Sequence, residues 1–246
     1  MIPKVIHYCW FGRAEKPKSV QKYLAAFHQL EYDGYKIIEW NEDNFDLTSN
    51  SYIRNAYGQK KWAHVSDFVR LDVLYNYGGI YLDTDIEIVS GFEDLLDLDF
   101  FIGFMWDCNL GTAVIGACQG NGIINELLSK YLNEEISLTS PNNDLFTRYF
   151  LEALPDFKLN GREQLLTGNI RILNKCVFEH PSLFKRKNRT IHHFSQSWKK
   201  NNKLKSKIKK FVIYIIGLYI YRKYICRKSL RMSPFYERYK IDLKAK

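Results

Sequence analysis

Apolar and polar positions change their spacing along this chain, and each spacing predicts a different element. Between residues 64 and 77 the apolar side chains recur at helical spacing, with Ser66 or Asp67 available as N-cap and Gly78-Gly79 directly afterwards. Glycine commonly ends a helix. From residue 80 to 89 apolar and polar residues alternate, as they do on a strand with one packed face. We therefore expect a helix, a glycine turn and a strand over residues 64–89.

The same comparison of spacings predicts elements in most of the chain up to residue 154. Strands are expected at 3–8, 35–40, 100–105 and 112–117. Helices are expected at 17–30, 121–133 and 142–154, with short helices through 43–58. Strands that alternate with helices favour an α/β fold with a mainly parallel sheet covered on both faces. The Gly-rich dinucleotide fingerprint is absent from the sequence, which disfavours a nicotinamide or flavin enzyme.

Acidic side chains gather on one face of the strand expected at 80–89. Tyr81, Asp83, Asp85 and Glu87 share this face, because successive side chains on a strand point to opposite sides. Carboxylate oxygens on a rigid element suit Mg²⁺ or Mn²⁺, and such an ion in turn suits a diphosphate. The alternative is an ordinary half-exposed strand with a solvated acidic face. The alternation alone is consistent with both interpretations.

Charge is divided unevenly between the two ends of the chain. The 246 residues carry a net charge of +9, but residues 199–246 hold 16 Lys and Arg and two acids, a net of +14. Residues 1–198 are therefore acidic, with a net charge of −5. We expect one domain over 1–198 and a basic tail over 199–246. An acidic domain without a recognised nucleic-acid module argues against nucleic acid as a partner.

The tail contains an apolar run at 211–221 with basic residues on both sides. This run is too short to span a bilayer as a helix, which takes about 20 residues. We expect it to lie at an anionic membrane surface, where each nearby Lys or Arg contributes about 1 kcal/mol. A terminal helix packed on the domain is the alternative. No apolar leader precedes the first strand, and the five cysteines show no disulfide or zinc spacing, so we expect a cytoplasmic protein on the inner face of the membrane, with free thiols.

Three segments of the sequence together resemble glycosyltransferase family 32. The pattern S-D-x-x-R at 66–70, followed by G-G-x-Y-x-D-x-D at 78–85, is similar to the sugar-binding region of that family. Residues 2–12 resemble its opening I-P-K-x-I-H-x-x-W-x-G, and residues 192–198 resemble its closing H-H-x-x-x-S-W. The family includes bacterial capsule and lipopolysaccharide transferases and yeast mannosyltransferases, and the glucosylating domains of the large clostridial toxins are similar.

This resemblance implies a retaining, metal-dependent glycosyltransferase with a GT-A type, Rossmann-like fold. It implies a nucleotide-sugar donor, for which we favour a UDP-sugar, and Mn²⁺ or Mg²⁺ as the cofactor. Together with the basic tail, it favours a lipid-linked glycan acceptor in bacterial capsule, exopolysaccharide or lipopolysaccharide synthesis. A GDP-mannose-dependent mannosyltransferase is the first alternative, because mannosyltransferases share the motif.

The resemblance also implies roles for single residues around a metal. Asp85 is expected to bind the ion, with His193 and Ser197 as further ligands, while Asp83 contacts ribose or sugar hydroxyls. Trp198 is expected to close over the diphosphate. Two adjacent histidines also have an ordinary interpretation, in which one belongs to the core and the other faces solvent.

Further residues are expected around the donor. By the same resemblance Trp10 stacks on the base, Tyr81 supports the ribose, and Asp67 and Arg70 grip sugar hydroxyls. Asn109 is expected near the donor sugar. Without the motifs, Trp10 would be a core aromatic residue, and Asp67 and Arg70, three positions apart, would be a surface pair on one helix face.

Two other classes of protein are alternatives. Residues 82–87 also resemble the D-x-D-x-T nucleophile strand of haloacid-dehalogenase-type phosphohydrolases, in which Asp83 would become phosphorylated. Glu87 stands where that motif has Thr or Val, which is a mismatch. The other alternative is a non-catalytic membrane-binding protein whose function lies in the tail.

Overall fold

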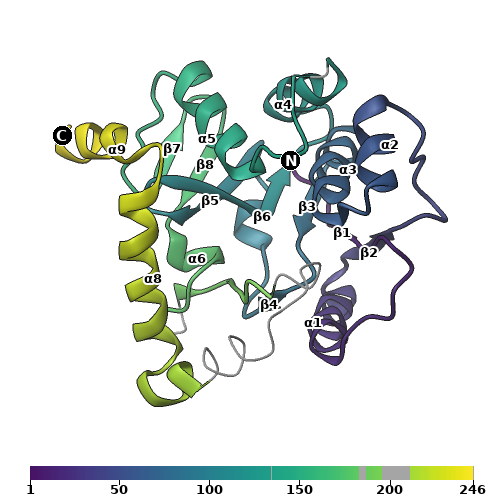
Figure 1. Cartoon of the computed structure of the whole chain (residues 1–246), viewed down its shortest axis with the longest axis horizontal. Helices are drawn as coiled ribbons and strands as arrows, with labels where there is room; N and C mark the ends of the chain where they lie inside the picture. The colour runs from purple at the N-terminus through teal and green to yellow at the C-terminus, as the bar shows by residue number, and fades with distance from the viewer. Residues whose placement is uncertain (134, 183–186, 196–210, 246) are drawn as a thin grey trace.

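The central sheet joins the N-terminal half of the chain to strands around residue 170. The computed structural model describes residues 1–133, 135–182, 187–195 and 211–245. Across the sheet the strands follow the order β2 (Lys36–Trp40), β1 (Val5–Cys9), β3 (Gly79–Leu82), β6 (Asn109–Ala117), β5 (Phe100–Trp106), β8 (Ile170–Leu173) and β7 (Gln164–Leu166) (Figure 1). A second, two-stranded sheet pairs β4 (Ile86–Ile88) with β9 (Thr190–His192).

Most strands of the large sheet run in the same direction. β1 pairs in parallel with β2 and β3, and β5 pairs in parallel with β8. β6 runs antiparallel to both β3 and β5, so β5 has the direction of β3. β7 runs antiparallel to β8 at the edge. The prediction of a mainly parallel sheet is confirmed, with β6 inserted between two blocks of parallel strands.

Helices cover both faces of this sheet, as the alternation of strands and helices predicts. One face carries α2 (Ser51–Gly58), α3 (Trp62–Tyr77), α4 (Gly122–Leu132) and α5 (Asn142–Ala153), and the other carries α1 (Lys18–Gln29) and α6 (Lys175–Phe178). Neighbouring residues of β5 pack into the apolar cores on opposite faces of the sheet. Phe100 packs against Phe150 of α5, while Phe101 packs against Phe178 of α6. Burial of both faces explains the nearly continuous apolar sequence of β5.

The glycine pair ends α3 and turns the chain into β3, as predicted. Gly78 has φ +64° and donates its backbone N–H to the carbonyl of Leu74. Gly79 has φ +109°, and a Cβ there would lie 2.5 Å from the carbonyl oxygen of Val5. Only glycine allows both this backbone conformation and the close approach of β1 and β3.

The start of α3 differs from the prediction. The helix begins at Trp62, so Ser66 and Asp67 lie inside it and do not cap it. The Ser66 hydroxyl instead donates to the carbonyl of Ala63. Asp67 is thereby one turn before Arg70 on the same helix face, as their spacing predicts.

The strand expected over 80–89 is interrupted by a turn. β3 ends at Leu82, and β4 begins at Ile86 in the small sheet. The Ile86 N–H donates to the carbonyl oxygen of Asp83 at 3.1 Å, which closes the turn over 83–85. The two aspartates therefore lie on a turn at the carboxyl end of β3 and not on one continuous strand face.

The tail ends in two helices, α8 (Leu218–Met232) and α9 (Tyr236–Lys244). α8 runs along one side of the molecule, and α9 follows at its end (Figure 1). The predicted apolar run is not one continuous helix, because Gly217 at φ +77° separates residues 211–216 from α8. Within the described part of the chain, no helix is long and apolar enough to cross a membrane. All five cysteines are free, as expected.

Candidate active site

The turn after β3 presents Asp83 beside the buried side chain of Arg70. Asp83 accepts a hydrogen bond from the Tyr81 hydroxyl at 3.0 Å and pairs with the Arg70 guanidinium at 3.4 Å. The guanidinium lies 4.6 Å from the centroid of the Tyr81 ring and donates to the carbonyl of Thr112 at 2.6 Å. Because Arg70 is only 4% exposed, these contacts fix its charge in one orientation.

Asp67 is the second carboxylate partner of Arg70. The Asp67 Oδ1 lies 3.0 Å from Arg70 Nη2 and also accepts a hydrogen bond from the side-chain amide of Asn142. Burial raises the pKa of Asp67 to about 6, although Arg70 opposes the rise. The pair that spacing predicts therefore joins a buried arginine to a partly buried aspartate and is not a solvated surface pair.

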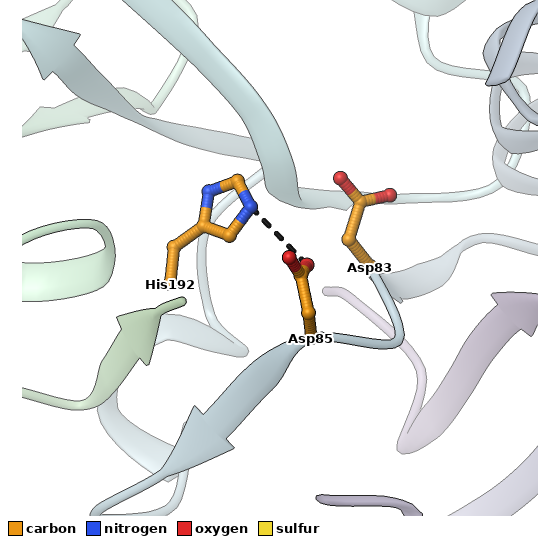
Figure 2. A group of neighbouring side chains, drawn as sticks. All are labelled: Asp83, Asp85 and His192. Atoms are coloured by element: carbon orange, nitrogen blue, oxygen red, sulfur yellow. Dashed lines mark ion pairs between the residues drawn. The ribbon is translucent and has the colours of Figure 1, made fainter. Parts of the chain in front are cut away.

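His192 reaches Asp85 from the far end of the sequence (Figure 2). The pairing of β4 with β9 sets Ile86 opposite His192, so the ring comes to lie beside the preceding turn. Its Nε2 lies 3.2 Å from Asp85 Oδ1, and its Nδ1 lies 2.7 Å from Glu179 Oε2. The backbone N–H of Ser195 donates to Asp85 Oδ2 at 2.6 Å. The imidazole is thus held between two carboxylates, one at each nitrogen.

Burial and ion pairing act against each other on these groups. Burial opposes ionisation of Asp85, but His192 and the Ser195 N–H outweigh it and hold the pKa of Asp85 at about 2. Burial also opposes protonation of His192, but Glu179 and Asp85 outweigh it and raise the pKa of His192 to about 10. An imidazolium in this position neutralises carboxylate charge. A metal ion bound here would take over that role while His192 gives up its Nε2 proton.

Asp83, Asp85 and His192, here called the D-D-H cluster, have the chemistry of a divalent metal site. One ligand atom from each lies within 4.8 Å of the others, and Figure 2 shows the three side chains facing one another. Two carboxylates and an imidazole are suitable ligands for a divalent cation. Glu179 binds the other ring nitrogen of His192, an arrangement usual for histidines that bind metal. The residues present therefore fit a divalent metal.

A cavity of about 440 Å³ opens onto the D-D-H cluster. Its lining combines the cluster with Arg70 and the aromatic side chains of Trp10, Trp62 and Phe194. Its volume is in the range of small-molecule and cofactor sites. The cavity thus brings acidic groups, a fixed cation and flat apolar rings to one place, which suits a ligand with phosphate, hydroxyl and planar ring groups.

Most of the predicted site residues that the structure describes meet at this cavity. Trp10, Arg70, Tyr81, Asp83 and Asp85 all line it. Trp10 is partly exposed, and its indole N–H donates to the carbonyl of Ala14 at 2.7 Å, which leaves the ring at the cavity wall. The structure therefore assembles residues that lie far apart in the opening motif and the central motif.

His193 does not join the cluster. Its Nε2 pairs with Glu87 at 2.7 Å, and its ring stacks on Tyr23 with the centroids 4.8 Å apart. Successive side chains of an extended chain point to opposite sides, so only one of the two adjacent histidines can face Asp85. The histidine that faces Asp85 is therefore His192 and not the predicted His193.

Asn109 also lies away from the predicted position. It is buried at the start of β6, donates to Asp144 at 2.8 Å, and is not among the residues that line the cavity. β6 begins at Asn109, earlier than the strand predicted at 112–117, so Asn109 belongs to the strand and lies beside α5. The predictions for Ser197 and Trp198 lie outside the described residues.

Sequence reasoning did not select several residues of this site, among them His192, Glu179 and Trp62. His192 belongs to the recognised histidine pair, but the sequence does not say which member faces the site. Glu179 lies in a region where no element was predicted. The sign of Trp62 in the sequence is indirect and lies in Gly12 of the opening motif. A Cβ on Gly12 would lie 2.7 Å from the Trp62 ring. That glycine allows the opening loop to approach the ring.

Comparison with known proteins agrees with the motifs. The family described as "Glycosyltransferase sugar-binding region containing DXD motif" matches residues 17–101, which include α3, the glycine pair and both aspartates. These matches support a glycosyltransferase family 32-like protein. Glycosyltransferase activity is thus supported by both motif and family match.

Similar proteins include glycosyltransferases from different organisms. The uncharacterized glycosyltransferase L373 of Acanthamoeba polyphaga mimivirus is 26% identical over 199 residues, which are 76% of this chain and 77% of that protein. Inositol phosphoceramide mannosyltransferase 3 of Schizosaccharomyces pombe is 26% identical over 133 residues, 52% of this chain and 36% of that protein. The solved structure of the PaToxG glycosyltransferase aligns over 63% of this chain and 70% of its own, with 22% identity and a TM-score of 0.48. The match to the mannosyltransferase thus spans little more than a third of that protein.

Proposed function

We propose that this protein transfers a sugar from a nucleoside diphosphate donor that binds through Mn²⁺ or Mg²⁺ at the D-D-H cluster. The observation that carries the proposal is the position of this cluster on a cavity of about 440 Å³ that also presents Arg70 and Trp10. The cluster suits a metal-bound diphosphate, Arg70 suits polar recognition, and Trp10 offers an apolar ring face. The match to the DXD region supports the same assignment.

Each residue has a separate task in the proposed reaction. The bond between the sugar and the diphosphate breaks through an oxocarbenium-like state while negative charge builds on the diphosphate. A divalent ion at the D-D-H cluster supplies electrostatic stabilisation of this leaving group. We assign Asp83, which Tyr81 and Arg70 hold in one orientation, to the hydroxyls of the donor. We assign Trp10 to stacking on the base.

We further propose a GT-A type fold and retention of the anomeric configuration. The acceptor oxygen would bond to the anomeric carbon on the face that the diphosphate leaves, and the diphosphate would take the acceptor's proton. The resemblance of the motifs supports this course. Asp83 and Asp85 are both engaged with cationic partners, Arg70 and His192, which supports a role in binding over one as nucleophile.

We favour a UDP-sugar as the donor, with GDP-mannose as the second candidate. The similarity to a mannosyltransferase of Schizosaccharomyces pombe supports the second candidate. The family match argues against the phosphohydrolase and the non-catalytic alternatives.

We also propose that the tail binds an anionic membrane and that the acceptor is a lipid-linked glycan at its cytoplasmic face, as in capsule, exopolysaccharide or lipopolysaccharide synthesis. The support is the outer face of α8, where exposed apolar and basic residues recur at helical spacing: Ile220, Lys223, Tyr224, Arg227, Lys228 and Arg231. Residues 211–231 contain no acid. Apolar side chains beside basic ones suit a bilayer interface. In this proposal residues 1–198 hold the donor and residues 199–246 dock the protein.

Thermal unfolding in the presence of UDP, GDP or CMP, each with and without Mn²⁺, tests the proposal. A ligand that binds only the folded state raises the unfolding midpoint by mass action. We expect a Mn²⁺-dependent rise with UDP. A rise with GDP alone would identify the second candidate. No rise with any of the three nucleotides would contradict a nucleotide-sugar site at the D-D-H cluster.

A further inference from the structure

We propose that Arg222 of α8 is a positioning residue for the metal site, so that the C-terminal helix supports the catalytic centre from behind. This inference rests on the proposed function, since the site that Arg222 supports is the D-D-H cluster. Arg222 would act through His192 and would touch neither the metal nor the donor.

The contacts of Arg222 join the tail to the segment that carries His192. Arg222 is 5% exposed, and its Nη2 donates to the carbonyls of His192 at 3.1 Å and His193 at 3.2 Å. Glu179 and Asp85 also attract its charge. A buried arginine is costly unless such partners surround it. The helix therefore places a cation directly behind the strand that presents the candidate metal ligand.

Phe194 extends this contact from the backbone to the imidazole ring. Its ring lies 3.9 Å from the His192 ring and 4.2 Å from the guanidinium carbon of Arg222, measured to ring centroids. Its φ of +50° is in the left-handed region, which a bulky residue seldom occupies without support. Trp106 and His180 also stack on it. Arg222 is thus one of several groups that hold Phe194 in this conformation.

The conformation at Phe194 matters for Asp85. The chain turns there, and the next residue, Ser195, donates its backbone N–H to Asp85 Oδ2 at 2.6 Å. Loss of the Arg222 contacts would release both the backbone of His192 and the turn that brings Ser195 to Asp85. Glu179 would still hold the ring at Nδ1. We therefore expect a weaker metal site and not a lost fold.

The two sides of α8 have different proposed roles. Arg222 and Cys226 lie on the buried side, where the Cys226 sulfur lies 3.6 Å from His180 Nε2. The exposed side carries the basic and apolar residues proposed for the membrane. The same helix thus contacts both the active-site segment and the proposed docking surface, and substitutions on the two sides should affect different measurements.

The test compares full-length Arg222→Ala, Arg222→Lys and Arg238→Ala for Mn²⁺ affinity in the presence of UDP, measured by calorimetry. Arg238 is the matched control, because it is also a tail arginine in an ion pair, with Asp242 on α9. We expect Arg222→Ala to weaken Mn²⁺ binding about tenfold or more, as loss of an outer partner of a metal ligand does. Arg222→Lys should recover part of the affinity, because lysine can still donate to the carbonyls. Arg238→Ala should bind Mn²⁺ like the wild type.

Thermal unfolding midpoints of the same variants, measured without metal, show whether a weaker Mn²⁺ site results from lost positioning or from a less stable fold. Wild-type Mn²⁺ affinity in Arg222→Ala, or an equal loss in Arg238→Ala, would overturn the inference while leaving the proposed function intact. Absence of Mn²⁺ and UDP binding in the wild type would overturn both. If Arg222→Ala does not fold, Phe194→Leu, which removes the stacked ring, replaces it: weaker Mn²⁺ binding is expected, and wild-type affinity would contradict the role.

Discussion

Glu179 and Asp85 hold His192 at opposite nitrogens of its ring. The contact of Glu179 with Nδ1 leaves Nε2 directed at Asp85, so Glu179 determines which nitrogen faces the cluster. Sequence analysis identified Asp83 and Asp85 because their motif is local. It did not identify His192, which meets Asp85 only through the pairing of β9 with β4, or Glu179, which binds the other nitrogen of that ring. Residues brought together by long-range strand pairing have no spacing in the sequence that marks them.

Replacement of Glu179 by Gln tests its role at the scale of single residues. The amide keeps the size of the side chain but removes the negative charge beside His192. We expect Mn²⁺ affinity in the presence of UDP to fall about 10- to 100-fold, the usual cost of losing an outer partner of a metal ligand. Glu87→Gln is the matched control, because Glu87 pairs with His193 outside the cluster. Equal affinities for the two variants would contradict the role of Glu179.

At the scale of elements, His7 of the opening motif holds β1, β2 and the glycine turn together. The Trp40 indole N–H donates to Nδ1 of His7 at 3.0 Å, so the proton of neutral His7 is on Nε2, which donates to the carbonyl of Gly78 at 2.8 Å. β1, β2 and the glycine turn were all predicted, because the apolar residues of the N-terminal strands and helices recur with clear periodicity. The strands β7 and β9 were not predicted, because each has only 3 residues, too few to show a period.

The position of His7 predicts a pH dependence of stability. Burial lowers the pKa of His7 to about 4 from its ordinary value of 6.5. Between pH 6.5 and 4 the unfolded state therefore binds more protons at this residue than the folded state, and stability falls as the pH falls. His7 should contribute a loss of about 3 kcal/mol across this window. In His7→Gln, the free energy of unfolding from urea denaturation should fall less steeply over this range, and parallel curves for the two proteins would contradict the prediction.

At the scale of the whole molecule, the C-terminal helices belong to the folded unit and also present an exposed basic face. Asp242 of α9 is 3% exposed and accepts a hydrogen bond from the backbone N–H of Leu159 at 2.8 Å. Charge and composition predicted a tail distinct from the domain. They did not predict that Arg222 would be buried against the active-site segment, because a basic residue is usually solvated. In the described part of the tail, the basic residues thus include a buried one, Arg222, and an exposed set on α8.

We expect the exposed basic residues of α8 to determine membrane binding. Changing Lys223, Arg227, Lys228 and Arg231 together to Gln removes four basic groups from the outer face of α8. Each is expected to contribute about 1 kcal/mol at an anionic surface, so sedimentation with vesicles that contain phosphatidylserine should fall sharply. The matched control changes four exposed basic residues elsewhere: Lys18, Lys22, Arg54 and Lys60. Undiminished vesicle binding by the α8 variant would contradict the docking role of the tail.

The proposed function depends on a metal site at which Asp83, Asp85 and His192 bind a divalent ion together with the donor diphosphate. Its most direct test is the Mn²⁺ dissociation constant in the presence of UDP for His192→Ala and His193→Ala. The two residues are adjacent, but only His192 faces Asp85, while His193 pairs with Glu87. We expect His192→Ala to weaken Mn²⁺ binding by at least about tenfold and His193→Ala to bind like the wild type. Equal binding by the two variants, or a loss in His193→Ala alone, would contradict this assignment.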